Sequence, residues 1–175
     1  MYFELLAGAL IAVLILWEAS KSKTSPGRRV PDRKVNVRQV VRALAKFNAR
    51  ARTRPRRGYS EKSLQAQLGA FLAERFETVV PEHGVASWNA THIDFDIGGG
   101  RVGVEVKLAR SLAKTTEFHR LSGQLESYTE HRYGADNLVV AVFGERKHSE
   151  NRALLRRIRR KIEEKSAVFA YAEIG

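Results

Sequence analysis

The sequence predicts an α/β fold in which helices cover a mixed central sheet, preceded by one N-terminal transmembrane helix. Two features predict the sheet. Residues 98–100 are consecutive glycines between two segments of strand-like alternation, and residues 137–143 are an almost entirely apolar run of strand length. The third feature is the apolar run 2–17, in which Glu4 is the one charged residue.

The globular part begins after residue 57 and alternates helices with strands. Ser60 is a favourable N-cap for the first helix, whose apolar residues recur at helical spacing. The glycine run is typical of a tight turn between two hairpin strands. The expected helices are 60–76, 115–131 and 150–165, the expected strands are 78–81, 92–97, 101–108, 137–143 and 167–174, and their order is αβββαβ followed by αβ.

Composition and charge limit the classes of function. The chain of 175 residues has room for one ordinary domain and an appendage. It contains no cysteine, which excludes disulfides, thiolate zinc sites and cysteine nucleophiles. The net charge is +12, but residues 21–57 hold fourteen Lys or Arg residues and one acid, which leaves 17 basic and 18 acidic residues elsewhere. This regional field predicts a polyanionic partner, either nucleic acid or anionic lipid.

The N-terminal apolar run predicts a membrane anchor. A helix of sixteen residues spans about 24 Å, slightly less than the hydrocarbon core of a bilayer. Tyr2 and Trp17 lie at its two ends, where aromatic rings favour the membrane interface. Because Lys and Arg follow the run and none precedes it, we expect the C-terminal domain to be cytoplasmic. A cleaved signal peptide and a buried helix are the alternatives.

Two basic segments follow the anchor. Residues 20–35 have the Ser, Gly and Pro content of a linker, and an amphipathic helix is expected from about 37 to 52. Basic residues recur every four positions along that helix and form one stripe: Arg38, Arg42, Lys46 and Arg50. The stripe is compatible with a solvated face, with anionic headgroups beside the anchor, or with nucleic acid guided to the domain. A second basic face, solvated or in contact with nucleic acid, is expected on helix 150–165, at Arg152, Arg156, Arg157, Arg159, Arg160 and Lys161.

Strand alternation places acidic residues and a lysine on one face of the predicted hairpin. Asp94 and Asp96 point away from the apolar residues of the first strand, and Glu105 and Lys107 do the same in the second. Carboxylate oxygens suit Mg²⁺, which takes waters and phosphates as its other ligands. A metal there polarises a phosphodiester and lowers the pKa of a bound water, while an ammonium orients that water or stabilises charge.

The next predicted helix adds polar groups to this face. Arg120, Gln124 and Tyr128 are spaced by four residues and therefore share one side of the helix. Gln and Tyr offer hydrogen bonds, and the Arg guanidinium is a fork suited to phosphate.

These residues resemble the PD-(D/E)XK, or restriction-endonuclease-like, nuclease superfamily. Its hallmark is an acidic residue on one strand and the motif (D/E)-X-K on the next, matched here by Asp94 in THIDFDI and by residues 105–107 in VGVEVKL. The segment RLSGQLESY resembles the Q-x-x-x-Y helix of the RecB-like branch. The literal Pro-Asp dipeptide is absent, because Ile93 precedes Asp94. The resemblance covers roughly residues 58–145 and implies a restriction-endonuclease-like αβββαβ core.

The resemblance also implies roles for individual residues. Asp94 and Glu105 bind Mg²⁺, for which Mn²⁺ can substitute, and the Val106 carbonyl is a further ligand. Lys107 positions or activates the water, and Gln124 and Tyr128 contact the substrate or brace the site. The segment SEKSLQAQLGAFL resembles the first core helix of the fold, where an acidic residue supports the metal site, and Glu61 occupies that position.

Five other polar residues are weaker candidates for the site. Asp96 is a second metal ligand or, more simply, a surface acid. Glu82 and His83 follow a short strand and either approach the site or belong to a loop. His92 and His119 contact phosphate or are ordinary surface residues.

The sequence is therefore interpreted as a membrane-anchored, Mg²⁺-dependent nuclease that acts on DNA in preference to RNA. The rival hypothesis is a catalytically inactive nuclease-like module that tethers nucleic acid at the membrane, and a lipid-surface scaffold is a third. The resemblance is also compatible with a homodimer. The expected divisions are a transmembrane anchor (1–19), a basic linker (20–35), a basic amphipathic helix with its connection (36–57) and the nuclease-like domain (58–175).

Overall fold

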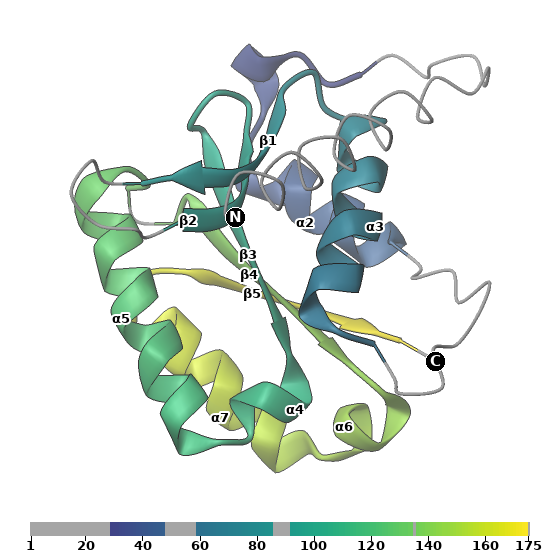
Figure 1. Ribbon diagram of the computed structural model, residues 1–175, viewed down its shortest axis with the longest axis vertical. Helices are drawn as coiled ribbons and strands as arrows, with labels where there is room; N and C mark the ends of the chain where they lie inside the picture. Colours follow the sequence, from purple (N-terminus) through teal and green to yellow (C-terminus); the bar gives the residue numbers. More distant parts are fainter. Residues whose placement is uncertain (1–28, 48–58, 86–91, 135, 175) are drawn as a thin grey trace, which may run out of the picture.

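The computed structural model describes residues 29–47, 59–85, 92–134 and 136–174 (Figure 1). The predicted anchor, the first part of the linker and Arg50 of the basic stripe lie outside these ranges. Within the described ranges, none of the helices has both the length and the apolar character needed to cross a bilayer.

Five strands form one mixed sheet in the order β1-β2-β3-β4-β5. The first three strands pair antiparallel, whereas β3, β4 and β5 run parallel. This arrangement confirms the predicted α/β fold with a mixed central sheet. The strands are β1 (Val79–Gly84), β2 (His92–Ile97), β3 (Val102–Leu108), β4 (Leu138–Gly144) and β5 (Val168–Glu173).

The helices agree with the predicted ones except near their ends. The predicted helix 150–165 corresponds to α7, which starts at Arg152 because the Asn151 side chain accepts the Leu154 amide and caps it. The sequence did not predict α4 or α6. The helices are the 3₁₀ helix η1 (Asp32–Lys34), α2 (Val37–Lys46), α3 (Glu61–Ala73), α4 (Ala109–Leu112), α5 (Thr115–His131), α6 (Arg146–Glu150) and α7 (Arg152–Glu163).

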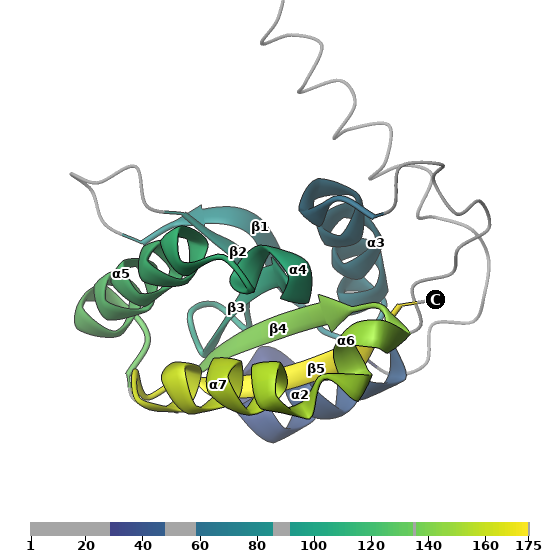
Figure 2. The same ribbon diagram turned by 90° about the horizontal axis from the view of Figure 1, so that it is seen from below.

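The helices cover both faces of the sheet and enclose two apolar cores (Figure 2). On one face α2 and α3 contribute Leu44, Leu64 and Leu68, and on the other α5 and α7 contribute Leu121 and Ile158. Every residue of β3 and β4 is buried, as expected for central strands that are covered on both sides. The polar residues of β3 are therefore enclosed by the fold.

The connection from β3 to β4 fixes where a site can form. Parallel neighbours need a long crossover, and here α4 and α5 supply it. As a result the carboxyl ends of β3, β4 and β5 lie together at one end of the strands, close to the start of α3 (Figure 1). In open α/β sheets ligand sites usually lie at the carboxyl ends of the strands.

Residues 29–35 pack on the domain, although the sequence placed them in the linker. Val30 forms a parallel bridge with Phe76, and the Asp32 carboxylate accepts hydrogen bonds from the Thr78 amide (3.1 Å) and hydroxyl (2.7 Å). Val35 is buried and lies against Gly98, whose φ is +69°. The apolar residues of this short segment thus pack in the core. The Ser, Gly and Pro content of the segment did not predict this packing.

Candidate active site

The site forms where β2 leaves β3. The paired register between them extends from Ile97 to Phe95, which lies opposite Val104. Beyond that pair, the β3 backbone amides on the side of β2 donate hydrogen bonds to side chains instead of to β2. The Val106 amide donates to Asp94 Oδ2 at 2.6 Å, and the Leu108 amide donates to Glu61 Oε1 at 3.1 Å. Two carboxylates therefore take the place of a strand, which satisfies the β3 backbone.

The side chains of Asp94 and Asp96 lie on different faces of the sheet, whereas the predicted alternation along β2 placed them on one face. Asp94 meets α3 through Gln65, whereas Asp96 meets the end of α5. Ile93 belongs to the core beside α5, and Phe95 belongs to the core beside α3. The prediction was wrong because side chains alternate strictly only where a strand is paired, and Asp94 is paired with no residue of β1 or β3 at the point where β2 leaves the β3 ladder.

Glu105 and Lys107 form a buried ion pair at the centre of the site. Only 2% of Glu105 is exposed, and the Lys107 ammonium donates to Glu105 Oε1 at 2.6 Å. The second carboxylate oxygen lies 3.1 Å from the Tyr128 hydroxyl, which is also 2.7 Å from the His92 carbonyl. One hydroxyl proton thus serves two acceptors, and an ionised Glu105 is the stronger of them.

Burial shifts the ionisation of this cluster. It raises the pKa of Glu105 to about 7, and the charge of Asp94 adds to that rise while Lys107 opposes it. The pKa of Asp94 is also raised, again mainly by burial, with the Val106 amide opposing the shift. Burial and Glu105 raise the pKa of Tyr128, so this hydroxyl stays protonated and remains a donor.

The donor set fits a hard divalent cation. No three His, Asp or Glu side chains of the described ranges converge on one point, so a metal there would need backbone or water ligands besides Asp94 and Glu105. The N–H and C=O of a strand residue leave the backbone on the same side, so the Val106 carbonyl projects toward Asp94 with its amide. Both carboxylates have a raised pKa, Glu105 in part because of the charge of Asp94, and a cation bound beside them would stabilise their ionised forms.

The α5 residues divide into a brace and a surface residue. Tyr128 is fully buried and so braces Glu105 without reaching a substrate. Gln124 extends the brace, with its Nε2 lying 3.4 Å from the Tyr128 hydroxyl and its Oε1 buried without a hydrogen-bond partner in the described structure. Arg120 is exposed and pairs with Glu117 at 2.8 Å, away from this cluster.

Gln65 is a site residue that the sequence analysis missed. Its Nε2 donates to Asp94 Oδ1 at 2.7 Å, so each oxygen of Asp94 accepts one hydrogen bond. Gln65 lies one turn after Glu61 on α3, and Ser60 caps that helix. The four-residue spacing between Glu61 and Gln65 was the available signal, because it places both side chains on one face of the helix.

Replacing Gln65 with Ala is expected to weaken Mg²⁺ binding about tenfold, because partners that orient a metal ligand typically contribute 10–100-fold to affinity. The measurement is an Mg²⁺ titration of the melting temperature, which does not depend on cleavage. Gln67→Ala is the matched control, since Gln67 lies on the same helix without a hydrogen bond to the site. Equal weakening in both variants would contradict an orienting role for Gln65.

Asp96 is a buried structural acid, so its prediction as a surface residue was wrong. Only 1% of it is exposed, and it accepts hydrogen bonds from the Gly100 amide (2.6 Å), Arg132 (2.7 and 3.0 Å) and the Tyr133 hydroxyl (2.9 Å). His83 Nε2 lies 3.8 Å from the same carboxylate. These contacts fasten the β2–β3 turn to the end of α5.

The remaining candidates lie outside the cluster around Asp94. Glu82 and His83 are part of β1 and not of a loop, and His119 is exposed on α5. His92 contributes its backbone carbonyl to Tyr128. The described residues of the basic stripe, Arg38, Arg42 and Lys46, are all exposed on α2, as are the basic residues predicted on α7.

Comparison with known proteins finds no matching family model, no matching curated protein and no matching solved structure. Any function for this chain must therefore be argued from its own residues and their geometry.

Proposed function

We propose that this protein is a Mg²⁺-dependent nuclease of the restriction-endonuclease-like type, which hydrolyses phosphodiester bonds of DNA in preference to RNA. The observation that carries the proposal is the placement of Asp94 on the Val106 amide, next to the buried ion pair of Glu105 and Lys107 on the neighbouring strand. The element order α3-β1-β2-β3-α5-β4 supports it, because it matches the αβββαβ core expected from the motif.

Asp94 and Glu105 would hold Mg²⁺, with Mn²⁺ as a substitute, and the Val106 carbonyl would add a third oxygen. The bound ion would polarise the phosphodiester and lower the pKa of an attacking water. Gln65 and the Val106 amide fix the orientation of Asp94, and Tyr128 fixes Glu105. The protein thus holds its carboxylates in place before any ligand arrives, which limits reorganisation during the reaction.

Lys107 would bind the attacking water or the phosphate. Its ammonium uses one donor on Glu105 and has two further protons, so it can hold a water or a phosphate oxygen beside the same carboxylate. Because the pair is buried, its field acts with little screening by solvent. We assign Lys107 the task of orienting the nucleophile or stabilising the pentacoordinate phosphate.

The proposal also includes attachment to the membrane. Residues 2–17 are apolar and basic residues follow them, which is the pattern of an anchor with a cytoplasmic C-terminal domain. The exposed Arg38, Arg42 and Lys46 would then guide DNA or contact headgroups, and Arg120 would contact phosphate.

A cleavage assay with the full-length protein tests the nuclease. We expect linear and closed circular DNA to be cut with Mg²⁺ and to remain intact with EDTA. Lys107→Ala should lower the rate at least about 100-fold, as the loss of one electrostatic contact to a transition state typically does. Lys165→Ala is the control, because it also removes one lysine from an ion pair. Lys165 follows the end of α7 and pairs with Glu126 on α5. Cleavage by Lys107→Ala at the wild-type rate would overturn the proposal.

A non-catalytic tether for nucleic acid is the second candidate function. The exposed stripe on α2 favours it, since no acidic residue lies within that helix to neutralise it. A tether should bind DNA with strong salt dependence and release no products with any metal. Its binding should survive Asp94→Ala, Glu105→Ala and Lys107→Ala alike, whereas a nuclease loses cleavage in all three.

A further inference from the structure

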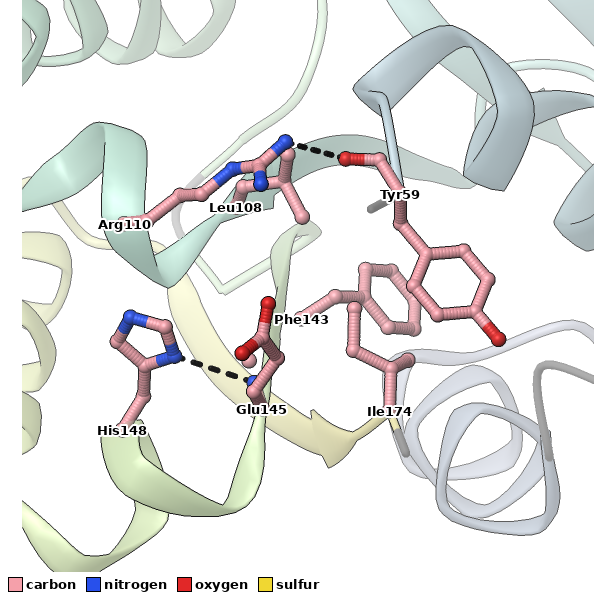
Figure 3. Close-up of a pocket in the computed structure, with 8 residues that line it drawn as sticks. Tyr59, Leu108, Arg110, Phe143, Glu145, His148 and Ile174 are labelled. Atoms are coloured by element: carbon pink, nitrogen blue, oxygen red, sulfur yellow. Dashed lines mark hydrogen bonds between the residues drawn. The ribbon is translucent and has the colours of Figure 1, made fainter. Parts of the chain in front are cut away.

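A pocket lies beside the candidate active site, at the carboxyl ends of the parallel strands (Figure 3). Arg110 and His148 line one side of it, and the ring of Tyr59 lies across from them. The remaining lining residues come from the ends of β3, β4 and β5 and from the start of α6: Leu108, Phe143, Gly144, Glu145 and Ile174.

Arg110 brings a positive charge to this pocket. One of its terminal nitrogens donates to the Tyr59 backbone carbonyl, which fixes the guanidinium at the mouth. That partner is neutral, and it occupies one of the five N–H donors of the guanidinium. The guanidinium therefore keeps its charge and most of its donors for another acceptor.

His148 supplies a ring N–H to the same pocket. Its Nδ1 accepts the Glu145 backbone amide at 3.1 Å, so in the neutral ring the proton lies on Nε2. The Glu145 carboxylate also lines the pocket, but Lys147 lies 3.2 Å from it and offsets its charge. The balance among these groups leaves one positive charge, that of Arg110.

The pocket continues the candidate active site along two elements. Tyr59 precedes Glu61 by two residues, and Leu108 directly follows Lys107. The hydrogen bond from the Leu108 amide to Glu61 joins these two elements at the border of pocket and site. A polynucleotide strand that lies across Glu61 and Lys107 would therefore pass the mouth of the pocket.

We propose that this pocket is a phosphate subsite for the strand that the enzyme cuts. The Arg110 guanidinium binds a phosphate next to the reacting one through its remaining donors, and His148 Nε2 donates to a second oxygen of that phosphate. The subsite rests on the proposed nuclease function and specifies how the substrate is held. It is a positioning site and takes no part in proton transfer.

The test is Arg110→Gln in the full-length protein. We expect KM for DNA to rise about tenfold, equivalent to about 1.4 kcal/mol, with kcat changed less than threefold. Equilibrium binding without added metal should weaken similarly, and the slope of log Kd against log salt should fall by about 1. Arg110→Lys keeps the charge without the fork and should keep the salt slope while recovering part of the affinity.

Arg101→Gln is the matched control, because it removes the same charge at an exposed residue directly before the start of β3, at the end of the strand away from the pocket. Equal effects of the two variants on KM and salt slope would overturn the subsite, and so would unchanged binding by Arg110→Gln. The binding arm separates this proposal from the nuclease. If the wild type binds DNA without cutting it, and Arg110→Gln alone loses a phosphate contact, the subsite stands and the catalytic assignment falls. Melting curves of all variants check that the loss of the Tyr59 contact has not unfolded them.

Discussion

Glu105→Gln is expected to abolish cleavage, with a loss of at least about 100–1,000-fold in kcat. The substitution keeps the size of the side chain and leaves an oxygen for Tyr128, but it removes one of the two proposed anionic metal ligands and the counter-charge of Lys107. Gel assays with Mg²⁺ and Mn²⁺ measure the loss. Glu130→Gln, at an exposed position on the same helix as Tyr128, should cleave like the wild type.

The same variant should change how stability depends on pH. In the metal-free wild type the pKa of Glu105 rises on folding from 4.5 to about 7, through burial and the charge of Asp94, against the pull of Lys107 and Tyr128. A raised pKa means that folding favours the protonated form. The stability it contributes is full below about pH 4.5 and is lost as the pH rises through about 7. The raised pKa of Asp94 acts in the same direction.

Melting temperatures between pH 4.5 and 8 measure this dependence. We expect the wild type without metal to lose roughly 1–3 kcal/mol over that range, since one unit of pKa shift corresponds to about 1.4 kcal/mol. Glu105→Gln should lose much less, because its side chain does not titrate. Added Mg²⁺ should restore the wild type most at high pH, where both carboxylates are ionised. A wild type that is most stable near pH 8 without metal would contradict the assignment.

Asp96→Asn is expected to destabilise the fold by about 2–4 kcal/mol, as the loss of one partner in a buried charged network does. The substitution removes the charge that faces Arg132 and replaces one acceptor oxygen with a donor beside the Gly100 amide or the Tyr133 hydroxyl. The hydrogen bonds that join the turn after β2 to the end of α5 are weakened. Urea unfolding followed by circular dichroism measures the difference.

The comparison with Asp94→Asn makes this result specific. Asp94 and Asp96 are two residues apart on one strand, yet they face different surroundings. Asp94→Asn should lose the stabilisation by Mg²⁺ with a small change in metal-free stability, whereas Asp96→Asn should be less stable with its Mg²⁺ response intact. Loss of the Mg²⁺ response in Asp96→Asn would mean that Asp96 is a metal ligand after all.

The sequence by itself determined the five strands and the four longer helices, α2, α3, α5 and α7. Helix α5 and strand β2 have the predicted bounds. The apolar pattern of α5 extends over many residues, and glycines mark the end of β2. The pair Glu105 and Lys107 was also readable, since alternate positions share a face along a strand that stays paired, as β3 does with β4. These features are local, so they needed no knowledge of which elements meet.

Only the tertiary structure decided the parts that depend on contacts between distant residues. Asp94 and Asp96 have equivalent positions in the local pattern, and they differ because β2 leaves the β3 ladder between them. Gln65 joined the site because α3 packs over the vacated edge of β3. The raised pKa of Glu105 likewise depends on its burial in the central strand β3 and on the charge of Asp94. Periodicity sets the direction of each side chain along its own element, whereas partners, burial and charge are fixed only when elements far apart in the chain pack together.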